Sequence, residues 1–173
     1  NSIAALVGEV LPLLAKTSSL VSIIHYSLFI TKLLPVKQLH MVTRNPLLTP
    51  DNTFNLAGWT DRITKGRPLV EQQAILDACT FAQQIHHSQT LPSGQPYLVH
   101  VVTVADILVE LGMETEVLVA AILHDVVEDQ QVTLEEIETR FGPMVRRLVD
   151  GVAKMKYIET LNDHSYKVEE ENS

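Results

Sequence analysis

The sequence predicts an all-α fold. Apolar residues recur at helical spacing along several segments, most clearly from Leu69 to His87. No segment shows the sustained alternation of apolar and polar residues that a half-buried strand needs. The chain has 173 residues, of which 46% are hydrophobic. It can therefore bury one core, and we expect a single helical domain.

Residues 1–40 differ from the rest of the chain, with many aliphatic residues, one acid and three lysines. Their longest uncharged stretch, Thr17–Thr31, is shorter than the roughly 20 residues that span a bilayer, so no membrane segment is expected. Two alternatives stay open for this apolar extension. It forms an additional helical hairpin kinked near Pro12 and Pro35, or it lies upstream of a natural start at Met41.

The middle of the chain divides at its prolines and glycines. Residues 41–68 are expected to form a linker with at most short helices. A helix should follow over Leu69–His87, and then the prolines and glycine of residues 88–97 force a loop. The next helix should run over His100–Gly112, where the glycine suits a C-terminal cap. The helix after it is expected to carry His124–Asp129.

The last part of the chain has clear helix boundaries. Thr133 and Glu136 have the spacing of a capping box, and that helix should stop at Gly142. Pro143 suits the first turn of the following helix. Beyond that helix the sequence turns polar, so residues 161–173 are expected to form a polar tail.

Charge and cysteine content limit the function. The net charge of -8 argues against broad electrostatic binding to nucleic acid. An anionic substrate bridged by a metal ion remains compatible, since the ion supplies the positive charge. The single Cys79 has no partner for a disulfide and is expected in the core, which favours the cytoplasm.

The most informative stretch is His124-Asp125 followed by Glu128-Asp129. If the helix continues through it, the four side chains project within a sector of about 100°. Three carboxylates then crowd the C-terminal end of a helix, where the macrodipole disfavours negative charge. A cation is expected at this place.

A second histidine completes a candidate metal site. His100 precedes His124 by one helix and one connection, which can bring both imidazoles and Asp125 together. Two histidines and a carboxylate suit Mn²⁺, Fe²⁺ or Zn²⁺ rather than Ca²⁺. Such an ion lowers the pKa of water that it binds, and Glu128 or Asp129 is placed to take the proton.

The other histidines have plainer interpretations. His86 and His87 end a helix, where positive side chains are favourable, so they are expected to cap it. His25, His40 and His164 lie outside any cluster and are expected to face solvent.

Three motifs follow the apolar helix in a specific order. They are HHSQTLPSGQPYLVH (86–100), AAILHDVVED (120–129) and VTLEEIETRFGPMVRRLVDGVAKM (132–155). Together they resemble the N-terminal hydrolase domain of the RelA/SpoT family, a branch of the HD metal-dependent phosphohydrolases. The resemblance covers roughly residues 69–157 and implies an HD-domain helical bundle, to which we assign residues 69–160.

The resemblance implies a (p)ppGpp 3′-pyrophosphohydrolase, which removes the 3′-diphosphate of the alarmone to give GDP or GTP and pyrophosphate. The family uses Mn²⁺, and its metal ligands match His100, His124 and Asp125. Glu128 and Asp129 match the pair that activates the attacking water. An adjacent synthetase domain in a longer cytoplasmic protein is also implied.

The nucleotide-binding loop departs from the family pattern. Ser93 matches a position that lines the nucleotide pocket, but Leu91-Pro92 replaces the usual Arg-Lys before it. Losing a cation that contacts a phosphate costs about 1.5–3 kcal/mol, so weak substrate binding is expected. The family's remaining metal-binding aspartate lies on a later helix, and no matching segment precedes Ser173. We therefore expect a bundle truncated on its C-terminal side that binds metal weakly.

Two functions stay open, with a hydrolase for another phosphoester as a third. The intact acidic motif favours the hydrolase, because crowded acids have little reason to persist at a disused site. Leu91-Pro92 favours an inactive regulatory HD domain that restrains the synthetase of a RelA-like GTP pyrophosphokinase.

Overall fold

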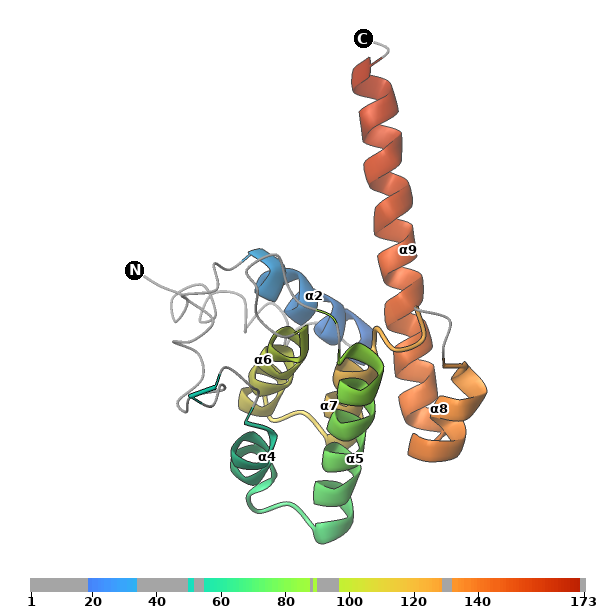
Figure 1. Ribbon diagram of the computed structural model, residues 1–173. Helices are drawn as coiled ribbons and strands as arrows, with labels where there is room; N and C mark the ends of the chain where they lie inside the picture. Colours follow the sequence, from blue (N-terminus) through green and yellow to red (C-terminus); the bar gives the residue numbers. More distant parts are fainter. Residues whose placement is uncertain are drawn as a thin grey trace.

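The computed structural model describes residues 19–33, 50–51, 55–87, 89, 97–128 and 132–171, with the backbone alone for residues 29–33 and 163–171. Every regular element within these residues is a helix, which confirms the all-α prediction. The helices are α2 (Leu20–Leu33), α4 (Leu56–Thr64), α5 (Leu69–His86), α6 (Tyr97–Glu110), α7 (Thr115–Leu123), α8 (Leu134–Phe141) and α9 (Pro143–Glu171), as Figure 1 shows.

The short helix α7 forms the centre of the bundle. It contacts α5, α6 and α9, and more lightly α2 (Figure 1). All of its residues except Glu116 are buried, because the sequence from Val117 to Leu123 is entirely apolar. The residues that follow α7, from His124 onward, are therefore attached to a buried helix.

The predicted boundaries of α8 are confirmed. The side chain of Thr133 accepts a hydrogen bond of 3.2 Å from the backbone N–H of Glu136, as a helix N-cap does. At the other end Gly142 has φ of 95°, a conformation that favours glycine, and its N–H binds the carbonyl of Glu138. Pro143 then begins α9.

The helices α5 and α6 are also found where they were predicted, with one difference. The C-terminal end of α6 lies just before Gly112, which has φ of 70°. Its beginning at Tyr97 precedes the predicted start at His100 by one turn, because no helix breaker stands after Pro96. Residues 88 and 90–96 of the predicted loop lie outside the described residues.

Helix α9 is much longer than predicted. It continues to Glu171, so the segment expected to be a polar tail is helical in its backbone (Figure 1). The sequence contains no glycine or proline after Gly151, and it is rich in lysine and glutamate, which are good helix formers. A polar sequence leaves a helix without an apolar face to pack against the core, but it does not end the helix.

The segments before residue 69 contribute to the core. Ile23, Ile24 and Leu28 of α2 are buried, and α2 contacts α6 and α9. Helix α4 is the kind of short helix predicted for residues 41–68, and it buries Trp59. The predicted kinks near Pro12 and Pro35, and Met41, lie outside the described residues.

Two further predictions about single side chains have different outcomes. Cys79 is buried, as expected, and burial raises the pKa of its thiol. His25 was expected to face solvent, which is wrong: it is only 6% exposed. Its Nε2 lies 2.6 Å from Oε1 of Glu159, so an ion pair or hydrogen bond joins α2 to α9.

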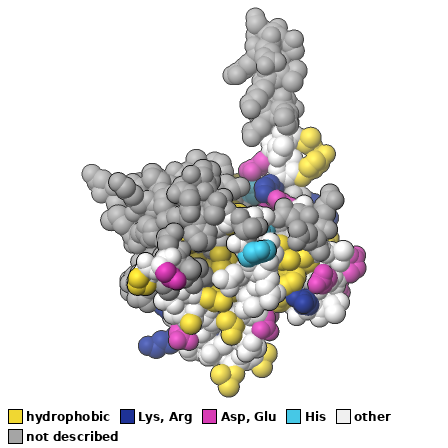
Figure 2. Space-filling model, viewed as in Figure 1, with side chains coloured by type: hydrophobic (Ala, Val, Ile, Leu, Met, Phe, Trp, Pro, Cys, Tyr) yellow, Lys and Arg dark blue, Asp and Glu magenta, His cyan; other side chains and the backbone are white. Residues whose placement is uncertain are grey.

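The described surface is mixed in character. In the view of Figure 2, acidic, basic and apolar side chains are interspersed over the bundle. Within the part of the chain that the structure covers, no helix is long and apolar enough to cross a membrane.

Candidate metal centre

The candidate site lies on a tight turn at the end of α7. The α-helix ends at Leu123, so the prediction that it continues through the acidic motif is wrong. Residues 124–128 form turns, in which Val126 N–H binds the carbonyl of Leu123 and Glu128 N–H binds that of Asp125, each at 3.2 Å. These bonds span three residues rather than four, so His124, Asp125 and Glu128 do not continue the α-helical face of α7.

The first candidate ligand, His124, is buried and fixed in orientation. It is 3% exposed, and its Nδ1 lies 2.7 Å from the carbonyl oxygen of Ala121. A carbonyl oxygen can only accept, so Nδ1 carries the hydrogen and donates it. Metal-binding histidines are typically held in this way by the ring nitrogen that does not bind the metal. The other ring nitrogen, Nε2, is thereby directed toward Asp125.

The contact between His124 and Asp125 fits a shared divalent ion. Nε2 of His124 lies 3.0 Å from Oδ2 of Asp125. Because Nδ1 already holds the ring hydrogen, Nε2 has none to donate unless the ring takes a second proton. Two ligand atoms at right angles on an ion with bonds of about 2.1 Å lie about 3.0 Å apart. The two donors therefore fit Mn²⁺ or a similar ion.

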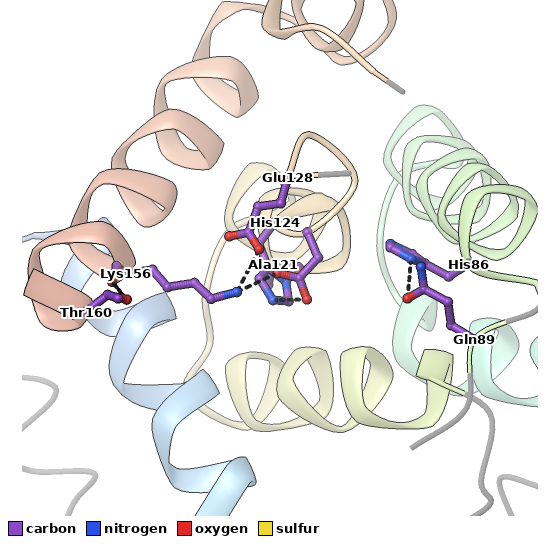
Figure 3. Close-up of polar contacts among 8 residues, drawn as sticks. His86, Gln89, Ala121, His124, Glu128, Lys156 and Thr160 are labelled. Carbon is purple, nitrogen blue, oxygen red and sulfur yellow. Dashed lines mark hydrogen bonds and ion pairs between the residues drawn. The ribbon is translucent and has the colours of Figure 1, made fainter. Parts of the chain in front are cut away.

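A lysine ammonium completes the acidic cluster. Nζ of Lys156 lies 2.8 Å from Oε2 of Glu128 and 3.3 Å from Oδ1 of Asp125, reaching the turn from α9 (Figure 3). Partial burial lowers the pKa of Lys156, but the hydrogen bond to Glu128 and the charge of Asp125 outweigh it, so that pKa lies above its usual value. The structure thus places a side-chain cation where the crowded acids require one.

The position of Glu128 suits contact with solvent. Its side chain is 36% exposed, twice as much as the 17% of Asp125. A carboxylate that is exposed on one side and paired on the other can accept a proton from water near the cluster. Its predicted partner Asp129 lies outside the described residues.

The structure brings together only part of the predicted metal site. His100 is buried on α6, which packs against α7, and its ring centroid lies 6.1 Å from that of Tyr97. Among the residues with described side chains, no three His, Cys, Asp or Glu groups gather closely enough to hold a metal ion. The complete set of His100, His124 and Asp125 therefore stays a prediction.

His86 is the last residue of α5, at the helix end where it was expected. Its burial was not predicted: it is only 5% exposed, and its ring centroid lies 4.6 Å from that of Tyr97. Its Nδ1 lies 3.1 Å from Oε1 of Gln89, away from the acidic cluster in Figure 3. The neighbouring His87 is exposed and contacts the carbonyl of Gln84, as a residue at a helix end does.

The predicted nucleotide-binding loop cannot be compared with this geometry. Ser93, Leu91 and Pro92 all lie outside the described residues. Their roles stay predictions.

Comparison with known proteins identifies the class of this chain. A family model described as an HD domain matches residues 78–173. Because the match covers more than half of the chain, the chain belongs to the HD domain family. The matched region includes α6, α7 and the turn that carries His124 and Asp125.

Similar curated proteins indicate which members of the HD domain family this chain resembles. The chain is 46% identical over 83 residues to the guanosine-3′,5′-bis(diphosphate) 3′-pyrophosphohydrolase of Vibrio cholerae, and 45% identical over 87 residues to that of Aquifex aeolicus. It is 48% identical over 88 residues to a probable GTP pyrophosphokinase of Mycobacterium leprae. These matches cover 48–51% of the chain but only 11–12% of the relatives. The chain is thus an HD domain related to the RelA/SpoT hydrolases and pyrophosphokinases, and it spans about a tenth of their length.

Proposed function

We propose that this HD domain hydrolyses (p)ppGpp at its 3′-diphosphate, releasing pyrophosphate and GDP or GTP, with Mn²⁺ as cofactor. The ion would be held by His100, His124 and Asp125. Glu128 and Asp129 would act on the attacking water, and Ser93 would line the nucleotide pocket. The domain would work beside a synthetase domain in a longer cytoplasmic protein.

One observation carries this proposal. The imidazole of His124 is oriented by the carbonyl of Ala121 so that its Nε2 meets Asp125 at 3.0 Å. This arrangement lies on the only His-Asp dipeptide of the sequence, inside the region that matches the HD domain. Two similar proteins whose names state the 3′-pyrophosphohydrolase activity support the choice of substrate.

The chemistry follows from the placement of these side chains. Hydrolysis forms a bond from a water oxygen to the phosphorus at the 3′ position and breaks the bond from that phosphorus to the 3′ oxygen, which leaves with a proton. Manganese, when bound, supplies a Lewis acid and lowers the pKa of water. His124 and Asp125 hold their donor atoms in fixed directions, because both follow the buried helix α7. Glu128 can take the water proton, since its carboxylate is partly exposed at the same turn.

The test is release of pyrophosphate from ppGpp by the protein with Mn²⁺. We expect His124→Ala to reduce the rate at least about tenfold, since perturbing metal ligation commonly costs 10–100-fold. His87→Ala is the matched control, because His87 is exposed and lies outside the cluster. A folded His124→Ala protein that keeps more than about a tenth of the wild-type rate would count against the assigned site.

A second candidate function has two observations in its favour. The ammonium of Lys156 already pairs with Asp125 and Glu128, and Leu91-Pro92 replaces the basic pair of the family. Both features suit a regulatory HD domain that binds substrate poorly. The variant Leu91→Arg with Pro92→Lys separates the two functions. Pyrophosphate release by the wild type supports the hydrolase, whereas release by the variant alone supports the regulatory domain.

A further inference from the structure

We propose that Lys156 is a built-in cation that neutralises Asp125 when no metal is bound and that a divalent ion must displace from Asp125 to bind there. This inference rests on the proposed metal-dependent function and concerns how the same site is regulated. Lys156 is assigned no role by the predicted motif or by the resemblance, and it comes from a different helix.

The geometry makes the two cations compete for the carboxylate of Asp125. Asp125 contacts His124 with Oδ2 and Lys156 with Oδ1, so both carboxylate oxygens are already engaged. A divalent ion bound to Asp125 and His124 would lie within a few ångströms of the ammonium. Repulsion scales with the product of the charges, so it is twice that between two monovalent cations.

The surroundings allow the ammonium to leave without unfolding the bundle. The side chain of Lys156 is 38% exposed, and its flexible stem can carry the charge into solvent. Glu128 is also partly exposed, and its 2.8 Å contact gives the ammonium a partner other than Asp125. The backbone of Lys156 stays fixed, because its carbonyl accepts the Thr160 hydroxyl at 3.0 Å within α9.

Displacement has two consequences. Metal binding must replace an existing ion pair, so Lys156 lowers the affinity of the site for divalent ions. The exchange also removes the contact that joins Asp125, at the end of α7, to α9. Metal occupancy is thereby linked to the attachment of α9.

The Mn²⁺ affinity of four proteins tests the proposal: the wild type, Lys156→Met, Lys156→Arg and Lys154→Met. The free aqueous ion is quantified by its electron paramagnetic resonance signal, so no activity is needed. Lys154 is the matched control, because it lies on the same helix, loses the same charge and pairs with Asp150 instead. Circular dichroism checks that each variant is folded.

We expect Lys156→Met to bind Mn²⁺ at least tenfold more tightly than the wild type, and Lys154→Met to stay within twofold. Lys156→Arg keeps the charge and should stay near the wild type. Equal affinities of the wild type and Lys156→Met would overturn the displacement and leave the metal site standing. Absence of Mn²⁺ binding by all four proteins would overturn the metal site and the displacement together.

A measurement on the wild type is independent of how the variants fold. With ¹³C-labelled lysine, the Cε signal of Lys156 can be assigned from its absence in Lys156→Arg and followed as Zn²⁺ is added. We expect it to move toward the shift of a solvent-exposed lysine while the signal of Lys154 stays in place. A Lys156 signal that does not move at saturating Zn²⁺ would overturn the proposal.

Discussion

Asp106 shows how a single charged residue is accommodated in this helical core. It is 4% exposed, and its carboxylate accepts hydrogen bonds from Arg62 at 2.9 and 3.0 Å and from Trp59 Nε1 at 3.1 Å. These contacts tie α4 to α6, and they satisfy a charge that could not otherwise be buried.

Removing this carboxylate should destabilise the whole domain. We expect Asp106→Ala to lower the free energy of unfolding by about 3 kcal/mol, because it leaves the charge of Arg62 and the N–H of Trp59 without their acceptor. Urea unfolding measures the change. Asp61→Ala, an exposed acid on the same helix α4, is the control and should shift stability by no more than about 0.5 kcal/mol. A similar effect of both substitutions would contradict this account.

The same residue predicts a pH dependence. Burial raises the pKa of Asp106, and the opposing charge and hydrogen bonds of Arg62 do not fully compensate. The folded state then holds the proton more tightly than the unfolded state, so stability falls as pH rises from the ordinary aspartate pKa through the raised one. Relative to Asp106→Asn, which does not titrate, the wild type should lose stability as the pH rises over the range above about 4. A relative gain over that range would show that pairing with Arg62 outweighs burial.

Contacts between residues that lie far apart in the sequence were not predicted from the sequence. His124, Asp125 and Glu128 were found from their spacing within one turn. Lys156 joins them from 31 residues away, and Glu159 covers His25 from 134 residues away. No local pattern encodes such contacts, because they depend on how α2, α7 and α9 pack.

At the scale of elements, the contact between α2 and α9 depends on a glycine. A Cβ placed on Gly151 would lie 2.7 Å from Cγ2 of Val21, closer than real contacts allow. Gly151→Ala should therefore lower stability, although alanine favours a helix by about 1 kcal/mol. The melting temperature measures the effect.

A second substitution tests the cause. Val21→Ala removes the clashing methyl groups, so Gly151→Ala should be stabilising in the Val21→Ala background. The change in stability caused by Gly151→Ala then has opposite signs with valine and with alanine at position 21. The same loss of stability in both backgrounds would show that the clash with Val21 is not responsible.

Helix boundaries were predictable where the sequence carries a physical stop signal. Thr133 and Gly142 bound α8 as predicted, because a side-chain cap and a positive φ act locally. The end of α7 at Leu123 was missed, since no glycine or proline marks the change to tight turns. The length of α9 was missed for the opposite reason, because polarity was taken as a stop signal.

At the scale of the whole molecule, the packed core is larger than the family region. The HD match begins at residue 78, yet α2 and α4 bury apolar side chains against the matched helices. A polar contact also joins α2 to the matched region. His25 of α2 pairs with Glu159 of α9, which lies three positions beyond Lys156. The fold class and the core of the matched region could be predicted from helical periodicity. The membership of α2 in the core could not, because an apolar segment alone does not specify its partner.

A chain that begins at Met41 tests the importance of α2. Ile23, Ile24 and Leu28 would be lost, and burial of three aliphatic side chains contributes about 3–8 kcal/mol. That is comparable to the total stability of about 5–15 kcal/mol of a typical domain. We expect the Met41 chain to melt far below the 173-residue chain or to aggregate, because the faces of α6 and α9 that α2 covers become exposed. A chain that begins at Ser19 retains α2 and is the control. A Met41 chain that melts within a few degrees of the Ser19 chain would show that α2 rests on the bundle without stabilising it.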